Sequence, residues 1–184
     1  MSWRVWEMCE TNLDGGEKGV AMSCATNKTL ELNYYHRVVG GGALGEITDY
    51  IGDTYIDHNA SPGSEGPAAV GMHLRALRNT FPDFALRSHE VIAENDWVAV
   101  RVTAEGTHLG EWLGIKPSGK RIQLRGLNFD RVLNGRIVEH WGDADTVGML
   151  AQLGVDLFVL STHGPRTKRN LRDGGVIAVG VLCH

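Results

Sequence analysis

The sequence predicts an α+β fold in which helices come first along the chain and an antiparallel sheet follows. Up to Pro82 the apolar residues recur at helical spacing, and from Phe84 onward they alternate at the period of two that is typical of strands. Asn134-Gly135, the strongest hairpin dipeptide in the chain, lies inside the alternating region. We therefore expect a meander of strands that curves around the helices.

Two long helices and a short one are expected in the first half of the chain. The first has Asn27 as its N-cap and stops at Gly40, the first of three glycines. The last begins with Pro67 in its first turn and ends at Pro82. Their apolar positions follow a helical spacing: Leu30, Tyr34 and Val38; then Leu44, Ile47 and Ile51 in the short helix that leads to Tyr55; then Val70, Leu74, Leu77 and Phe81.

Four strands are expected in the second half of the chain. Their ranges are 84–93, 97–105, 121–133 and 136–141. Three turns join them: residues 94–96, the glycine-rich segment that follows residue 105, and Asn134-Gly135.

The length of 184 residues fits one domain with two tails, because a second core would be cramped. Residues 1–26 show no period and predict a poorly ordered N-terminal extension, residues 27–157 form the domain, and residues 158–184 form a C-terminal extension. Charged residues precede any apolar run, so we expect no signal peptide, and no stretch approaches the length of a transmembrane helix. A soluble cytoplasmic protein is predicted.

Composition argues against several classes of function. A net charge of -4 and a pI near 6.0 leave no basic field for a phosphate backbone, so nucleic acid is not an expected partner. Without a stretch of transmembrane length, a membrane is not an expected partner either. Cys9, Cys24 and Cys183 are odd in number and widely spaced, which predicts reduced thiols rather than disulfides or a zinc site. The chain has no Gly-x-Ser-x-Gly and no His-Glu-x-x-His, so covalent and metal-dependent hydrolysis lack support.

Three segments carry a resemblance to a known family. They are residues 106–121 (GTHLGEWLGIKPSGKR), 55–59 (YIDHN) and 137–154 (IVEHWGDADTVGMLAQLG). Together they resemble the SnoaL-like polyketide cyclases, within the superfamily of nuclear transport factor 2 and ketosteroid isomerase, over about residues 30–154. The resemblance implies a cone-shaped α+β barrel around one enclosed pocket. It also implies an aldol closure of a polyketide-derived ester by an aspartate, with no metal or cofactor, and a homodimer.

The sequence departs from that family at the acidic position directly after Trp141, which is Gly142 here. Either Asp143 or Asp145 takes over as acid/base, or the pocket only binds. Asp145 matches the second acidic position and is also a candidate helix N-cap, whereas Asp143 is also a candidate for a solvated turn residue. A carboxylate enclosed by apolar groups has its pKa raised toward the range useful for proton transfer.

Three histidines are further candidates, each with a structural alternative. His108 either donates a hydrogen bond to a substrate oxygen or faces water beside its turn. His140 either partners a carboxylate or is a core residue. His58 either lies over the pocket opening or bonds to nearby backbone groups.

Other residues are candidates for lining the pocket. Asn128, in the middle of a strand, needs a partner for its amide, which a polar pocket lining would supply. Trp112 and Trp141 offer flat surfaces for an apolar or aromatic ligand, or pack in the core or at a dimer contact.

We therefore predict a cofactor-free enzyme that binds a small apolar carbonyl compound and catalyses proton transfer, as in cyclisation or isomerisation. One alternative resembles limonene-epoxide hydrolase and needs Asn128 and Asp145 to activate water; the other is a non-catalytic binding or dimerisation module, which Gly142 favours. Dimerisation is expected through the outer face of the sheet. That face carries either Leu127 and Phe129 or Ile122 and Leu124, because the two sets alternate along one strand.

Overall fold

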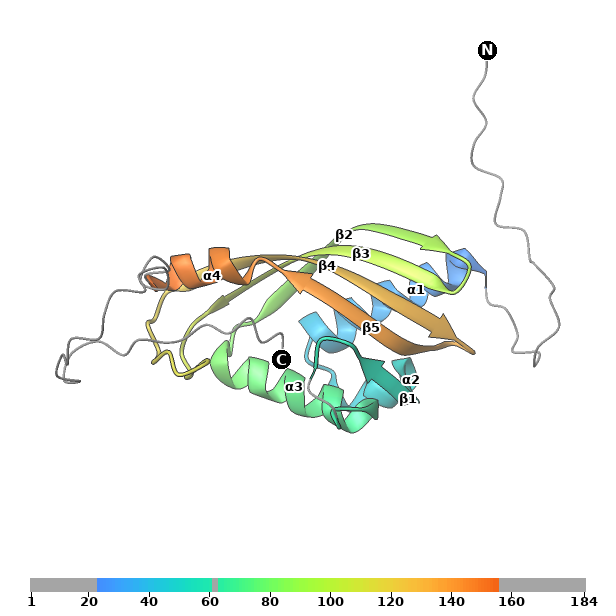
Figure 1. Cartoon of the computed structure of the whole chain (residues 1–184), viewed down its shortest axis with the longest axis horizontal. Coiled ribbons are helices and arrows are strands. Elements are labelled where there is room, and N and C mark those ends of the chain that lie inside the picture. Colours follow the sequence, from blue (N-terminus) through green and yellow to red (C-terminus); the bar gives the residue numbers. More distant parts are fainter. Residues whose placement is uncertain (1–22, 61–62, 156–184) are drawn as a thin grey trace, which may run out of the picture.

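The computed structural model describes residues 23–60 and 63–155, which form one curved five-stranded sheet with helices against one face (Figure 1). The helices are α1 (Cys24–Asn33), the π-helix η1 (Tyr34–Gly40), the 3₁₀ turn η2 (Leu44–Glu46), α2 (Ile47–Tyr50), α3 (Gly66–Thr80) and α4 (Thr146–Leu153). The strands are β1 (Ile51–Asp57), β2 (Ala85–Glu94), β3 (Trp97–Thr107), β4 (Arg121–Leu133) and β5 (Arg136–Ala144). None of the helices in the described ranges is long and apolar enough to cross a membrane.

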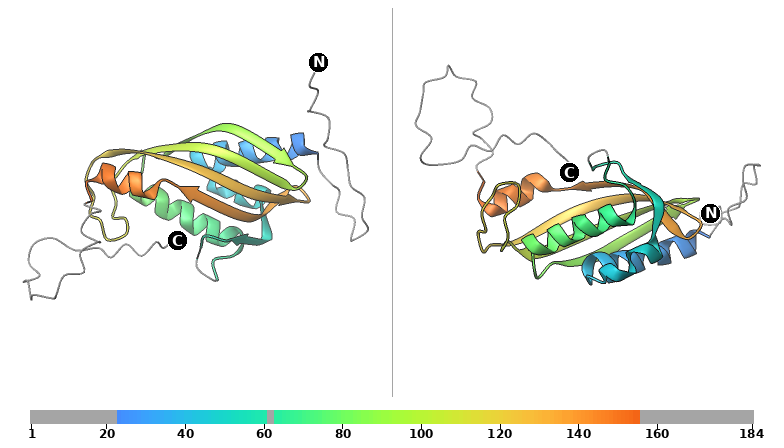
Figure 2. Two further views of the ribbon diagram at one scale, coloured as in Figure 1. Left: turned by 45° about the horizontal axis from the view of Figure 1, so that its top comes forward. Right: turned by 90° about the horizontal axis from the view of Figure 1, so that it is seen from below.

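The sheet has the strand order β1-β5-β4-β3-β2, so β1 and β2 are its edges and it stays open. Strands β2 to β5 form the predicted antiparallel meander, although β3 and β5 run on to Thr107 and Ala144. The β4–β5 turn has φ of 50° at Asn134 and 73° at Gly135, as the favoured two-residue hairpin turns require. The predicted α+β meander is therefore confirmed (Figure 2).

Strand β1 differs from the expectation, because the helical spacing of Leu44, Ile47 and Ile51 predicts a helix through Ile51. Helix α2 ends at Tyr50, and β1 then pairs in parallel with β5, with Asp57 opposite His140. In β1 the fully buried positions are Ile51 and Tyr55, four residues apart, so their spacing also fits a helix. The pairing with β5, which is distant in sequence, makes this segment a strand rather than a helix.

The first helix begins before Asn27, so the prediction of Asn27 as its N-cap is wrong. Ser23 is the cap, and its side chain accepts a hydrogen bond from the backbone N–H of Thr26 at 3.2 Å. Asn27 lies inside the helix and is 1% exposed, and its amide donates to the carbonyl of Asn95 in the β2–β3 turn. Asn27 therefore does not cap the helix but connects it to the sheet through this hydrogen bond.

Cys24, at the start of α1, is disulfide-bonded, which corrects the expectation of three reduced thiols. The two other cysteines of the chain lie outside the described residues. Wide spacing in the sequence does not show which thiols meet in space. The thiol argument for a cytoplasmic location therefore no longer holds, because disulfides are rare in that compartment.

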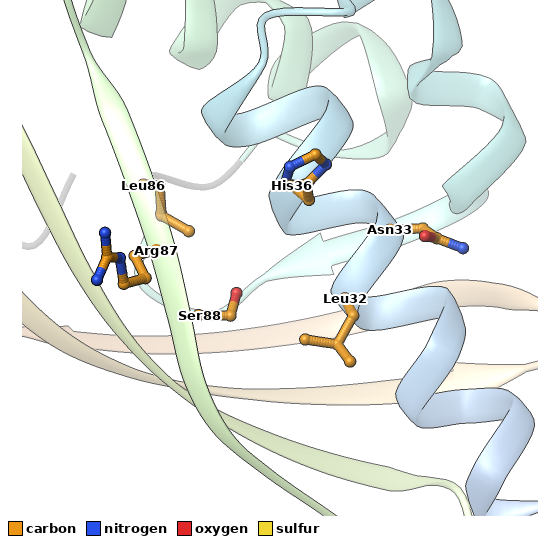
Figure 3. A pocket seen from close by; sticks show the side chains of 6 residues that line it. All are labelled: Leu32, Asn33, His36, Leu86, Arg87 and Ser88. Atoms are coloured by element: carbon orange, nitrogen blue, oxygen red, sulfur yellow. The ribbon is translucent and has the colours of Figure 1, made fainter.

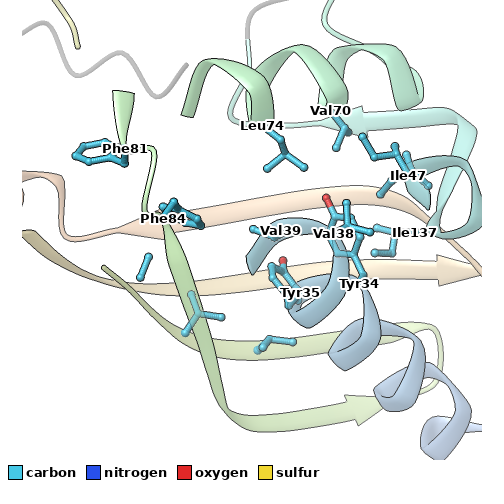
Figure 4. Packing of buried hydrophobic residues seen from close by; sticks show 14 of the residues in the cluster. Tyr34, Tyr35, Val38, Val39, Ile47, Val70, Leu74, Phe81, Phe84 and Ile137 are labelled. Atoms are coloured by element: carbon cyan, nitrogen blue, oxygen red, sulfur yellow. The ribbon is translucent and has the colours of Figure 1, made fainter. Parts of the chain in front are cut away.

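The core lies between the helices and the inner face of the sheet, which we define as the face turned toward the helices (Figure 4). Strand β3 alternates strictly, with Val98, Val100 and Val102 buried against the helices. On β4 the inner position Ile122 is 3% exposed, whereas Leu127 and Phe129 on the outer face are 55% and 43% exposed. Burying each such aliphatic side chain contributes about 1.5–3 kcal/mol, and this contribution fixes the register of the sheet.

Candidate active site

Strands β4 and β5 bring a histidine and an aspartate together on the inner face. Asp130 and His140 stand opposite each other in the β4–β5 pair, and His140 Nδ1 lies 2.6 Å from Asp130 Oδ1. The second oxygen, Asp130 Oδ2, accepts a hydrogen bond from the hydroxyl of Tyr35 at 2.9 Å. The Asp130 side chain is 1% exposed and that of His140 is 19% exposed. Asp130 therefore fixes the imidazole through Nδ1 and leaves the Nε2 edge of the ring accessible.

The charge of His140 is set by two opposing effects. Burial lowers the pKa of His140, but the hydrogen bond and the charge of Asp130, with the charge of Asp57, outweigh burial and raise that pKa above 6.5. Histidine is the side chain whose ordinary pKa lies closest to neutral pH, so it can both take up and release a proton there. His140 thus has the properties of an acid/base group.

Gly142 provides the space that the His140 ring occupies. It lies two residues beyond His140 on the same face and stands opposite Asn128. A Cβ built on Gly142 would lie 2.8 Å from His140 Nε2 and 3.2 Å from Asn128 Oδ1. The imidazole and the amide therefore converge where the family motif carries its acid. In the part of the chain that the structure describes, no hydrogen bond to the Asn128 side chain is formed, so this amide is available to a ligand.

The end of β1 packs beside this cluster and positions it. The backbone N–H of His58 donates to the carbonyl of His140 at 2.9 Å, and that of Gly142 donates to Asn59 Oδ1 at 2.6 Å. Asp57 Oδ1 in turn accepts from the backbone N–H of Asn59 at 2.9 Å. These bonds explain why the YIDHN segment and the β5 motif, far apart in sequence, form one structural unit.

The two aspartates predicted as acid/base groups lie away from His140. Asp143 is exposed on the outer face, where it borders an open hollow of about 330 Å³ together with Phe129 and Trp141. Asp145 caps α4, which confirms that part of its prediction: its Oδ1 accepts from the backbone N–H of Gly148 at 2.9 Å. Neither carboxylate forms a hydrogen bond with a histidine of residues 23–60 or 63–155. A catalytic role for either, or for Asp145 with Asn128, stays a prediction.

His108 follows the end of β3 and is 0% exposed, so it does not face water. Its Nδ1 accepts from the backbone N–H of Ser118 at 3.3 Å and lies 3.1 Å from Ser118 Oγ, which assigns the ring proton to Nε2. This Nε2 is buried without a partner among the described residues, and the ring packs on Phe81. His108 lies ten positions beyond Val98, the residue opposite Asp130, which corresponds to about 33 Å along an extended strand.

His58 and Trp141 face outward. Their rings stack at 3.9 Å with an interplanar angle of 5°, and His58 Nε2 lies 3.0 Å from Glu139 Oε2. Trp141 also packs against Trp97 and Phe129. Trp112 lies in the loop before β4, partly buried against the core. The three rings on the strands lie on the opposite face of the sheet from the His140–Asp130 pair.

A second open hollow, of about 530 Å³, lies between the first helical segment and β2 (Figure 3). Its lining residues are Leu32, Asn33, His36, Leu86, Arg87 and Ser88. No predicted site residue belongs to it. Both hollows are open to solvent, and the enclosed pocket stays a prediction.

Sequence reasoning missed two members of the cluster, Asp130 and Tyr35. The signal for Asp130 was available: it shares the inner parity of β4 with Ile122 and Val132, and a charged residue at such a position needs a partner. Nothing in the local sequence distinguishes Tyr35 from a core residue of the first helix.

Comparison with known proteins identifies the family. The model of the SnoaL-like polyketide cyclases matches residues 30–153. Aklanonic acid methyl ester cyclase AcmA of Streptomyces galilaeus is 28% identical over 120 residues, which cover 61% of this chain and 81% of that protein. Nogalonic acid methyl ester cyclase of Streptomyces nogalater is 30% identical over 108 residues, covering 58% and 78%. The structure of IdmH from Streptomyces antibioticus matches with a TM-score of 0.62 and 30% identity, over 70% of this chain and 99% of IdmH. The chain belongs to the SnoaL-like polyketide cyclase family.

Proposed function

We propose that this protein catalyses proton transfer on a small, largely apolar carbonyl compound, as in the cyclisation of a polyketide-derived ester, with His140 as its acid/base group. One observation carries the proposal. The ring of His140, held by Asp130, projects its Nε2 over Gly142, the position at which the family motif has an acid.

The chemistry needs one group that takes a proton and returns it. With Nδ1 bonded to Asp130, the Nε2 lone pair of neutral His140 removes a proton from the carbon next to a carbonyl, so a C–H bond breaks and an N–H bond forms. The enolate carbon then attacks a second carbonyl of the same molecule and forms the new C–C bond. The resulting alkoxide takes the proton back from Nε2. The Asp130 carboxylate stabilises the imidazolium between the two transfers, and no metal or cofactor is required.

Two features support the class of substrate. The relatives named above are cyclases of aklanonic acid methyl ester and nogalonic acid methyl ester, and this favours a related ester as the substrate here. The inner face beside His140 combines aliphatic side chains with the amide of Asn128, which is suited to hydrogen-bond an enolate oxygen.

The test uses a panel of methyl esters that carry 1,3-dicarbonyl groups. Exchange of the α-proton for deuterium, followed by NMR, measures the first transfer, and product analysis measures ring closure. His140→Gln should lower both rates at least about a hundredfold. In the unaltered protein the rate should rise with pH through a midpoint above 6.5, because the basic form of a histidine with a raised pKa appears only there.

Asp143→Asn and Asp145→Asn are the matched comparisons. If one of them abolishes exchange while His140→Gln retains it, a carboxylate is the acid/base group and our assignment is wrong. If the unaltered protein binds members of the panel but exchanges none of their protons, the protein is a binding module.

We also propose that a second copy of the chain covers the outer face of the sheet. Leu127 and Phe129 are exposed there beside Trp97 and Trp141, and soluble monomers rarely expose such a row. Sedimentation at micromolar concentration should give a dimer of about 40 kDa, twice the 20.1 kDa chain, and Phe129→Glu should shift it toward monomer. A monomer across a dilution series of the unaltered protein contradicts this proposal.

A further inference from the structure

A second carboxylic acid lies in the helical layer beside the His140–Asp130 pair. Glu31, in α1, is 0% exposed, and both of its carboxyl oxygens are buried without a hydrogen-bond partner among the described residues. Four residues later Tyr35 donates its hydroxyl hydrogen to Asp130, and residues four apart share one face of a helix. Glu31 therefore faces the same part of the sheet as Tyr35.

Among the described residues, the charge that acts on Glu31 is that of Asp130, and no arginine or lysine compensates it. Asn27 Oδ1, one helical turn earlier, is likewise buried without a partner, and Asp130 is already an acceptor from Tyr35 and His140. An ionised Glu31 would add two more acceptor oxygens and a second negative charge to this buried group, and buried charges are found paired. A protonated Glu31 instead supplies an O–H donor.

We propose that Glu31 is a positioning residue for the His140–Asp130 pair: it is held as a neutral carboxylic acid, and its proton is shared with the Asp130 carboxylate. The inference rests on the proposed function, because His140 is the acid/base group whose orientation Glu31 supports through Asp130. The shared proton withdraws charge from Asp130, so this aspartate orients the imidazole without holding its proton too tightly.

The electrostatics agree with this arrangement. Burial raises the pKa of Glu31 well above its usual 4.5, and the charge of Asp130 raises it further. The titratable groups that interact with the cluster come from every element packed on it: Tyr34 and Tyr35 of η1, Tyr55 and Asp57 of β1, His73 of α3, Asp130 of β4 and His140 of β5. Arginine and lysine are absent from that set of described residues, so no permanently charged cation favours ionised Glu31.

The first test uses the unaltered full chain. Glutamate side chains are labelled with ¹³C at the carboxyl carbon, and the Glu31 resonance is assigned through bonds and followed from pH 5 to 9. At pH 7 it should keep the chemical shift of a protonated acid, whereas an ordinary glutamate has ionised above about pH 5. The shift of an ionised carboxylate at pH 7 would overturn the proposal.

The second test follows the titration of His140 by NMR in two variants. Glu31→Gln, which is neutral and keeps a donor, should leave the His140 midpoint within about 0.3 pH unit of the unaltered protein. Glu31→Met, of similar size but without a donor, should raise it by about 0.5–1 unit because Asp130 regains its full charge. The resonances of His89, on β2, report whether the fold is intact.

Two outcomes of this titration contradict the inference. A midpoint lowered by about one unit or more in Glu31→Gln means that a negative charge was removed, so Glu31 was ionised. An unchanged midpoint in Glu31→Met means that Glu31 does not act on the pair. If the Gln variant does not fold, the ¹³C measurement decides alone. Turnover enters neither readout, so failure of the proton-exchange assay refutes the proposed function without touching this result.

Discussion

His140, on the inner face of β5, and His108, directly after the end of β3, have surroundings that differ in kind. His140 has a carboxylate 2.6 Å from Nδ1 and a side chain that is 19% exposed, so its outer edge can meet a substrate. His108 has a serine on Nδ1 and is completely buried, with an Nε2–H that meets neither solvent nor a partner among the described residues.

The comparison shows what converts a buried histidine into a proton carrier. A histidine needs a charged partner that stabilises the imidazolium and an accessible nitrogen through which the proton enters and leaves. His140 has both features and His108 has neither. The resemblance to the family singled out His108 by its motif, whereas the geometry favours the histidine that lies beside the substituted acid.

The largest effect is expected from Asp130→Asn, which removes the partner that distinguishes the two histidines. The amide no longer fixes the tautomer or stabilises the imidazolium, so turnover should fall by about 10²–10⁴. Burial is then opposed only by the charge of Asp57, and the pKa of His140 falls, so the midpoint of the pH–rate profile moves to lower pH. Steady-state kinetics between pH 5 and 9 measures both changes. An unchanged profile would mean that Asp130 is only structural.

A smaller effect is expected from Gly142→Ala, which disturbs His140 without changing its partner. The new Cβ would lie 2.8 Å from His140 Nε2, and the 2.6 Å bond to Asp130 prevents the ring from moving away freely. We expect a loss of about 1–3 kcal/mol in the free energy of unfolding and about a tenfold loss of turnover. Denaturant unfolding and the exchange assay measure them.

Gly45→Ala is the control for this variant, because a Cβ on Gly45 meets nothing within 4 Å. Equal losses in the two variants would show that the effect of Gly142→Ala has nothing to do with His140.

The sequence predicts the meander well and the site only in part, and the reason is the range of the interactions. Alternation along β3 and the turn at Asn134-Gly135 are local signals, and both are confirmed. Asp57 and His140, which pair between β1 and β5, lie 83 positions apart in the sequence. Tyr35 and Asp130, which a hydrogen bond joins, lie 95 positions apart. Local periodicity carries no information about such contacts. Local periodicity also does not decide whether the Asp143 side chain points to the inner or the outer face of the sheet. One extra residue in β5 moves every side chain after it to the opposite face.

The smallest effect is expected from His108→Leu, which tests the other half of the comparison. The substitution removes the Nδ1 contacts with Ser118, each worth about 0.5–1.5 kcal/mol, but it also removes a buried Nε2–H that has no partner among the described residues. Ser118 is exposed, so water can replace the lost acceptor. The two contributions oppose each other, and we expect the free energy of unfolding to change by less than about 1 kcal/mol. Turnover should fall by less than about threefold, since about 33 Å of strand separate this ring from the His140 pair. A hundredfold loss of turnover at unchanged stability would instead show that His108 Nε2–H donates to the substrate, and the two histidines would then act at one site.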